Sequence, residues 1–282
     1  MTFSPFDSPI YATIYGDPEV RALFTDSAEV RAMLLVEGTL AKVQGELGLI
    51  PLDSALYIHR ASMEVQVDPA GLAVGMAQSG SPVPALVAAF GKAMEAPDHA
   101  KYIHYGARSQ DILDTALVLR LRQYLRILDT RLEMLADKSG FSELAKLRQQ
   151  LRVAQDKLLV VRFAGSGDFS ENNKVEAALA QALKLAKPTD PSVFAHKGIL
   201  EMAAVVSRIT VTLAEIANEF TTSLNTEVLA TMAIFTDSQL PLMQPAQAQG
   251  NVTLALEKLA LAQICIAGSV ALKHAQTMAE KA

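Results

Sequence analysis

Residues 200–235 read LEMAAVVSRITVTLAEIANEFTTSLNTEVLATMAIF, a run without proline or glycine. Its apolar side chains recur in steps of three or four residues, as on one face of a helix: Met202, Val206, Ile209, Leu213, Ile216, Phe220, Leu224 and Val228. We predict one continuous helix here, about 50 Å long at the usual rise per residue. Helices of that length are typical of bundles and coiled coils.

Further helices are predicted on both sides of this run. Residues 26–47 carry one apolar stripe, with Asp26 or Ser27 as the cap, and Gly48 ends the stripe. Other helices are expected over 85–96, from about 111 to 138, over 141–159, over 173–186 and after a Gln/Pro-rich break at 239–250. Since no strand or repeat is recognisable, we predict an all-α bundle with an N-terminal helical domain (1–100) and a central bundle (101–282) whose C-terminal part is short.

The composition narrows the class of protein. Half of the residues are apolar, and the net charge of −5 comes without a basic stripe, so nucleic acid is not an expected partner. Cys265 is the single cysteine and lies in an apolar run, which fits a buried thiol and a reducing compartment. The first residues lack signal-peptide features and no apolar run reaches about 20 residues, so a cytoplasmic protein without membrane contact is expected.

One segment has the residue types of a binding site. Residues 104–115, HYGARSQDILDT, place a histidine, a glycine turn and a Ser-Gln-Asp trio at a helix start. Backbone N–H groups at a helix start attract anions, and the side chains of Ser109 and Gln110 add donors, which predicts a substrate with a carboxylate. The alternative is that Ser109 and Asp111 only cap the helix, and from residue type alone capping is the commoner role.

Several stretches resemble the 3-carboxy-cis,cis-muconate cycloisomerase family of the fumarase/aspartase superfamily of lyases. The HYGARSQDILDT motif resembles the first signature of that superfamily. SGSPVPALV (79–87) resembles its Gly-Asn-Pro turn, with Ser81 in place of the Asn. Residues 4–51, LLVVRFAGSGD (158–168) and LALAQICIAG (259–268) resemble other parts of the same enzymes. The resemblance implies a long-helix bundle of the fumarase/aspartase type.

The resemblance also implies a function and a set of site residues. Members form homotetramers, and signatures from three subunits meet at each active site, with no metal or organic cofactor. In this family a substrate carboxylate adds to a double bond of the same molecule and gives a lactone, in the protocatechuate branch of aromatic degradation. By position, Ser109 and Gln110 would hold a substrate carboxylate, His104 would contact the substrate, and Ser81 would line the pocket.

The chain also departs from the family pattern. Arg108 stands where the family has threonine, and its guanidinium could either add a carboxylate contact or fill the pocket. The second signature is absent around 138–141. The best match to the third signature is 237–245, where Ser238 would be the general base and Met243 replaces a lysine. Two hypotheses therefore stand: an active cycloisomerase, or a shortened and catalytically impaired relative that acts as a helical oligomeric scaffold. An adenylosuccinate lyase is less favoured, because its first signature prefers tyrosine at Gln110.

Overall fold

The computed structural model describes residues 4–138, 141–166, 170–187, 195–243 and 251–280. The regular secondary structure of these residues is helical, and an isolated parallel bridge joins Val160 and Ala186. The all-α prediction is confirmed. The chain divides into two compact units that interleave along the sequence: Met1–Phe24, Arg122–Leu158 and Phe194–Ala282 form unit 1, and Thr25–Leu121 with Leu159–Val193 form unit 2. The division at residue 100 stays a prediction.

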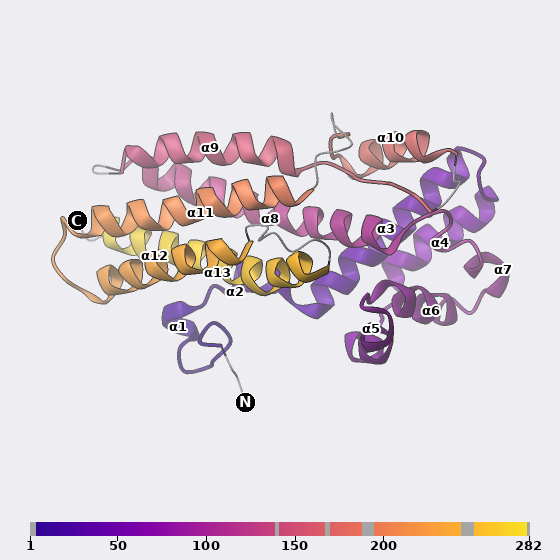
Figure 1. The fold of residues 1–282 in the computed structure, drawn as a ribbon, viewed down its shortest axis with the longest axis horizontal. Coiled ribbons are helices and arrows are strands. Elements are labelled where there is room, and N and C mark those ends of the chain that lie inside the picture. Colours follow the sequence, from indigo (N-terminus) through magenta and orange to yellow (C-terminus); the bar gives the residue numbers. More distant parts are fainter. Residues whose placement is uncertain (1–3, 139–140, 167–169, 188–194, 244–250, 281–282) are drawn as a thin grey trace. The chain divides into compact units, whose positions relative to one another are not determined.

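Unit 2 is built around one helix hairpin. Its helices are α3 (Asp26–Glu46), α4 (Leu52–Glu64), α5 (Ala73–Ser79), α6 (Val83–Ala93), α7 (Pro97–Ala100), the first part of α8 (Ser109–Ala136) and α10 (Asn172–Leu183), with a 3₁₀ turn at Pro69–Leu72 (Figure 1). Helix α3 packs along α4, and Gly45 lets Ala55 approach where a Cβ atom would lie only 2.3 Å from the Ala55 methyl group. Gly48, with φ of +72°, ends α3 as the sequence predicted. The cap is Thr25 rather than Asp26 or Ser27, because the Thr25 hydroxyl accepts the Ala28 N–H at 3.2 Å.

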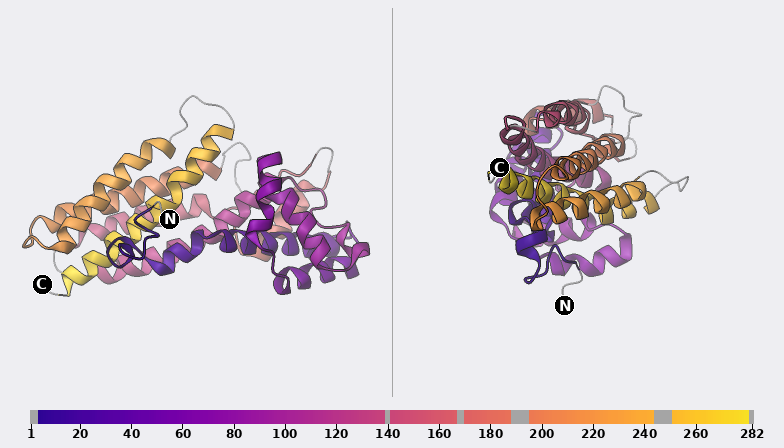
Figure 2. Two further views of the ribbon diagram at one scale, coloured as in Figure 1. Left: turned by 90° about the horizontal axis from the view of Figure 1, so that it is seen from below. Right: turned by 90° about the vertical axis from the view of Figure 1, so that its left-hand side faces the viewer.

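Unit 1 is a set of long helices that lie side by side. It contains the short α1 (Ala12–Tyr15) and α2 (Pro18–Arg21), a 3₁₀ turn at Ala22–Phe24, the rest of α8, α9 (Glu143–Leu158), α11 (Ala195–Ala217), α12 (Leu224–Met243) and α13 (Asn251–Ala279). Helix α11 contacts α9, α12 and α13, and two further views show these helices running alongside one another (Figure 2). Gly268 of α13 permits a close approach to α11, since a Cβ atom there would lie 2.4 Å from a methyl group of Val206.

The single helix predicted over 200–235 is wrong, because two antiparallel helices replace it. Helix α11 ends at Ala217 and α12 begins at Leu224. Between them Ser223 and Thr226 bond to each other's backbone: the Ser223 N–H donates to the Thr226 hydroxyl at 2.8 Å, and the Thr226 N–H donates to the Ser223 hydroxyl at 3.4 Å. This reciprocal cap favours a new helix start over continuation. Helices α11 and α12 each bury one face, so the apolar spacing continues across the turn between them. The sequence pattern therefore does not reveal the turn.

The break expected at 239–250 is wrong for residues 239–243. Residues 239–243 continue α12, with Pro241 inside its last turn, and 244–250 lie outside the described residues. A proline near the end of a helix removes one backbone hydrogen bond without stopping the helix at once. No helix in the described ranges is long and apolar enough to cross a membrane.

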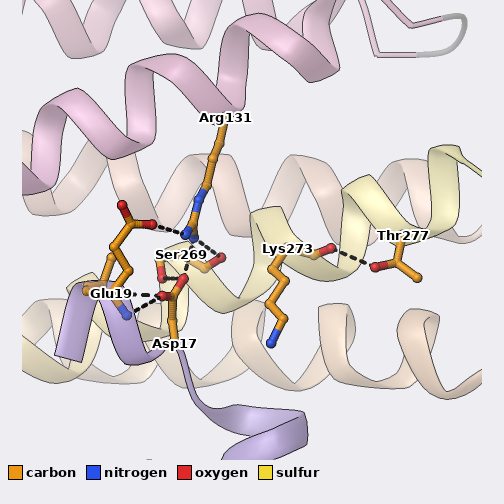
Figure 3. Close-up of polar contacts among 7 residues, drawn as sticks. Asp17, Glu19, Arg131, Ser269, Lys273 and Thr277 are labelled. Atoms are coloured by element: carbon orange, nitrogen blue, oxygen red, sulfur yellow. Dashed lines mark hydrogen bonds and ion pairs between the residues drawn. The ribbon is translucent and has the colours of Figure 1, made fainter. Parts of the chain in front are cut away.

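A buried ion pair fastens the N-terminal segment of unit 1 to its long helices (Figure 3). Asp17 is 2% exposed, and its side chain accepts the Glu19 and Val20 N–H groups, each at 3.2 Å, which caps α2. The same carboxylate pairs with Arg131 of α8 and accepts the Ser269 hydroxyl of α13 at 2.6 Å. Burial alone would raise the pKa of Asp17, but the hydrogen bonds from Arg131 and Ser269 and the charge of Arg131 lower it below its ordinary value.

Candidate functional site

The predicted site is a tight turn that leads into α8 within unit 2. His104 and Gly106 both adopt left-handed backbone conformations, with φ of +61° and +65°. The Ala107 N–H closes the turn on the His104 carbonyl at 3.2 Å, and α8 begins at Ser109. Glycine adopts this conformation readily, whereas a histidine there is uncommon and needs support from its surroundings.

Asp111 provides part of that support. Its buried carboxylate accepts three backbone N–H groups: Arg108 at 2.9 Å, Ala164 at 3.0 Å and Gly165 at 3.1 Å. The Ser166 N–H in turn donates to the Gly106 carbonyl at 2.8 Å. Asp111 therefore caps its own helix, as the capping alternative predicted, and also joins the turn to the glycine-rich 164–166 segment.

Helix α3 supports the same turn from another direction. Two of its buried polar residues, one on each side of Leu40, reach the turn: the Gln44 amide donates to the Tyr105 carbonyl at 2.6 Å, and Glu37 Oε1 lies 2.7 Å from His104 Nδ1. Glu37 and Gln44 are seven residues apart, two helical turns, so both side chains leave the same face of α3. The turn is consequently fixed at Tyr105, His104 and Gly106.

The electrostatics of the turn favour a charged imidazole. Burial alone would lower the pKa of His104, but the hydrogen bond and the charge of Glu37, with a further contribution from the charge of Asp111, raise it above its ordinary value. The side chain keeps 21% of its surface exposed. A cation near solvent at a helix start is suited to meeting an anion.

The structure brings four of the predicted residues together. His104, Arg108, Ser109 and Gln110 lie within one turn and the first residues of α8, where Arg108 and Gln110 are exposed and Ser109 is half-buried. The Gln110 amide donates to Asp114 Oδ1 at 2.5 Å. An anion bound here would have to share that amide.

The other two predicted residues lie elsewhere in the chain. Ser81 stands before α6, where its hydroxyl accepts the Val83 N–H at 3.3 Å and its backbone carbonyl accepts the Ser79 hydroxyl at 2.8 Å. Ser238 belongs to unit 1 and lies inside α12, exposed, with its hydroxyl bonded to the Phe235 carbonyl at 2.7 Å. Ser238 therefore lies within a regular helix, and its catalytic role stays a prediction.

Sequence reasoning missed Glu37 and Gln44. A signal for Glu37 was present, because it is a lone carboxylate inside the stripe of Met33, Val36 and Leu40, where a charge is costly unless it has a partner. Gln44 gave a weaker signal, since glutamine is common on both faces of helices. Which group either residue would meet was not readable from spacing.

Comparison with known proteins agrees with this fold. The structure superposes on the 3-carboxy-cis,cis-muconate lactonizing enzyme from Pseudomonas putida with a TM-score of 0.89 at 26% identity, over 97% of this chain and 76% of that one. The 3-carboxy-cis,cis-muconate cycloisomerase of Pseudomonas aeruginosa is 30% identical over 247 residues, 74% of this chain and 54% of that protein. An adenylosuccinate lyase of Methanocaldococcus jannaschii is 35% identical, but over only 44% of this chain and 26% of its own length. No protein-family model matches.

The fold and its relatives place the chain in the fumarase/aspartase superfamily of helical lyases. Within that superfamily its homologues include 3-carboxy-cis,cis-muconate cycloisomerases and, at 29% identity over 76% of this chain, the N-acetyl-S-(2-succino)cysteine lyase of Enterococcus italicus. The chain spans about half the length of the curated relatives that it matches.

Proposed function

We propose that the protein is a cycloisomerase acting on 3-carboxy-cis,cis-muconate or a close analogue. The observation that carries this proposal is the gathering of His104, Arg108, Ser109 and Gln110 at one helix start, in a chain homologous to cycloisomerases. A histidine with a raised pKa, a guanidinium, a hydroxyl and an amide are donors suited to a polycarboxylate.

The reaction in this proposal is a lactonisation. An oxygen of one substrate carboxylate forms a bond to a carbon of the double bond, and the neighbouring carbon takes up one proton. Negative charge builds on the carboxylate conjugated with the double bond before that proton arrives, so donors fixed around this carboxylate lower the barrier. Ser109, Gln110 and Arg108 would hold the carboxylate, while His104 and Ser238 are the candidates for proton transfer and Ser81 for lining the pocket.

In this proposal the protein is a cytoplasmic homotetramer. Its reaction belongs to a pathway of aromatic degradation. Homology to the cycloisomerases supports it, together with the single cysteine, which fits a reducing compartment. Size-exclusion chromatography with light scattering tests the tetramer, and a monomer would contradict it.

The test of activity is the loss of 3-carboxymuconate absorbance in the presence of the purified full chain. Ser109→Ala should slow turnover about 10-fold or more, since a hydrogen bond to a charged group contributes about 1.5–3 kcal/mol. Ser238→Ala should abolish turnover if this serine is the base. Thr231→Ala, an exposed hydroxyl that bonds within α12, is the matched control and should keep the wild-type rate.

The second candidate is a shortened relative that acts as a helical oligomeric scaffold. The replacement of a lysine by Met243 and the helical setting of Ser238 favour it. An oligomer that binds 3-carboxymuconate without converting it would support this candidate and refute the cycloisomerase. Adenylosuccinate should give no product in a parallel assay.

A further inference from the structure

Glu37 is a buried carboxylate with a single hydrogen-bond partner among the described residues. It is 1% exposed and lies on the apolar face of α3. Oε1 meets His104 Nδ1 at 2.7 Å, whereas Oε2 has no partner in the described part of the chain. Because an unpaired buried carboxylate is strongly disfavoured, the contact with His104 is the interaction that permits Glu37 to be there.

His104 makes this contact from a left-handed backbone conformation. His104 has φ of +61°, and the residues after it are fixed by bonds from Gln44 to the Tyr105 carbonyl and from Ser166 to the Gly106 carbonyl. Left-handed non-glycine residues persist where the surroundings over-determine them, and they cluster at functional sites. The turn therefore holds the backbone of His104 in place while the imidazole contacts Glu37.

The pairing determines which ring nitrogen carries a proton. An ionised carboxylate only accepts hydrogen bonds, so His104 Nδ1 must be the donor to Glu37. The second nitrogen, Nε2, is then the one left for a ligand, on a side chain that is 21% exposed. A carboxylate on one ring nitrogen fixes the tautomer and raises the basicity of the other.

We propose that Glu37 is a positioning residue that holds His104 protonated at Nδ1 and favours its cationic form, so that Nε2–H is offered to a carboxylate of the small organic acid bound at the start of α8. The proposal rests on the proposed function for its ligand. It adds to the site a residue of α3, which lies outside the 104–115 motif. Two charged groups act on the ring in the described part of unit 2: Glu37 from α3 and Asp111 from α8.

The first test follows the His104 ring by nitrogen-detected NMR across pH 5–9, with its signals assigned by comparison with His104→Asn. In the wild-type protein we expect a protonation midpoint above 6.5 and, at high pH, the tautomer with the proton on Nδ1. Glu37→Gln should move the midpoint below 6.5, because burial remains while the larger of the two opposing charges is gone and only the smaller contribution of Asp111 is left. Glu29→Gln, another α3 carboxylate that pairs with a buried arginine, is the matched control and should leave the midpoint unchanged.

Two outcomes of this titration would overturn the positioning role. One is a wild-type ring with its proton on Nε2 at high pH, a result that does not depend on whether Glu37→Gln folds. The other is an equal midpoint in the wild type and in a folded Glu37→Gln protein.

The second test measures binding of propane-1,2,3-tricarboxylate by calorimetry at several pH values. The wild-type affinity should fall as pH rises through the His104 midpoint, and at pH 7 Glu37→Gln should bind about 10-fold more weakly. If the titration behaves as expected but neither the tricarboxylate nor 3-carboxymuconate binds, the proposed function and the ligand part of this inference fail together, whereas the Glu37–His104 coupling stands.

Discussion

Removal of the Asp111 carboxylate should destabilise the turn before α8 and the 164–166 segment together. Asp111→Ala leaves three backbone N–H groups without their acceptor. Hydrogen bonds to a charged group contribute about 1.5–3 kcal/mol each, so the simple sum is roughly 4.5–9 kcal/mol. Arg108 and Ala164 are exposed and can bond to water instead, while Gly165 is buried. We therefore expect a loss of about 3–5 kcal/mol, a large part of the usual stability of a domain.

Urea unfolding followed by circular dichroism gives the global effect, and amide hydrogen exchange gives the local one. A loss of about 3–5 kcal/mol predicts exchange at Gly165 faster by roughly 10²–10⁴-fold. Asp111→Asn keeps one acceptor oxygen and should fall between the wild type and Asp111→Ala. Asp53→Ala removes an exposed first-turn carboxylate from α4 and should lose no more than about 1 kcal/mol. Equal losses in Asp111→Ala and Asp53→Ala would refute the reasoning.

Two further predictions concern unit 1. Because the pKa of Asp17 is lowered, its contribution to stability is present above about pH 3.8 and is lost as pH falls through the folded-state value. Asp17→Asn leaves Arg131 without its buried partner, so it should cost about 3–5 kcal/mol at pH 7 and flatten the decline in melting temperature below pH 4. An unchanged decline would count against the ion pair. Gly268→Ala should destabilise the protein by about 1–3 kcal/mol in urea unfolding, because the added methyl group would meet Val206. The same change in a Val206→Ala background should cost clearly less, and equal costs would rule out this contact as the cause.

The sequence predicted helix positions well wherever one apolar face continued to a clear stop. Helices α3, α8 and α9 match their predicted ranges within a few residues, since Gly48 and the polar connections after α8 are unambiguous breakers. The turn between α11 and α12 was missed for a physical reason. Ser223 and Thr226 cap a new helix, but they do so without glycine or proline and without disturbing the apolar spacing.

The candidate site was predictable only in part, because some of its residues are neighbours in the sequence and others are not. The 104–115 motif is local, so its residues could be read directly and they lie together. The groups that fix it come from far along the chain: Glu37 and Gln44 from α3, and the backbone of Gly165. Such partners depend on how helices pack, which one sequence does not specify.

The hydrogen bond between Asp17 and Ser269 has a consequence for folding during synthesis. The two residues are separated by 252 positions, so this hydrogen bond cannot form until the ribosome has added 252 residues after Asp17. At the usual elongation rates of roughly 5–20 residues per second, that interval is about 13–50 s. Throughout it Asp17 can already pair with Arg131, but it lacks Ser269, and α2 lacks its contacts with α13. Unit 2, whose last segment ends at Val193, can assemble first and leave unit 1 to be completed when α13 has been synthesised.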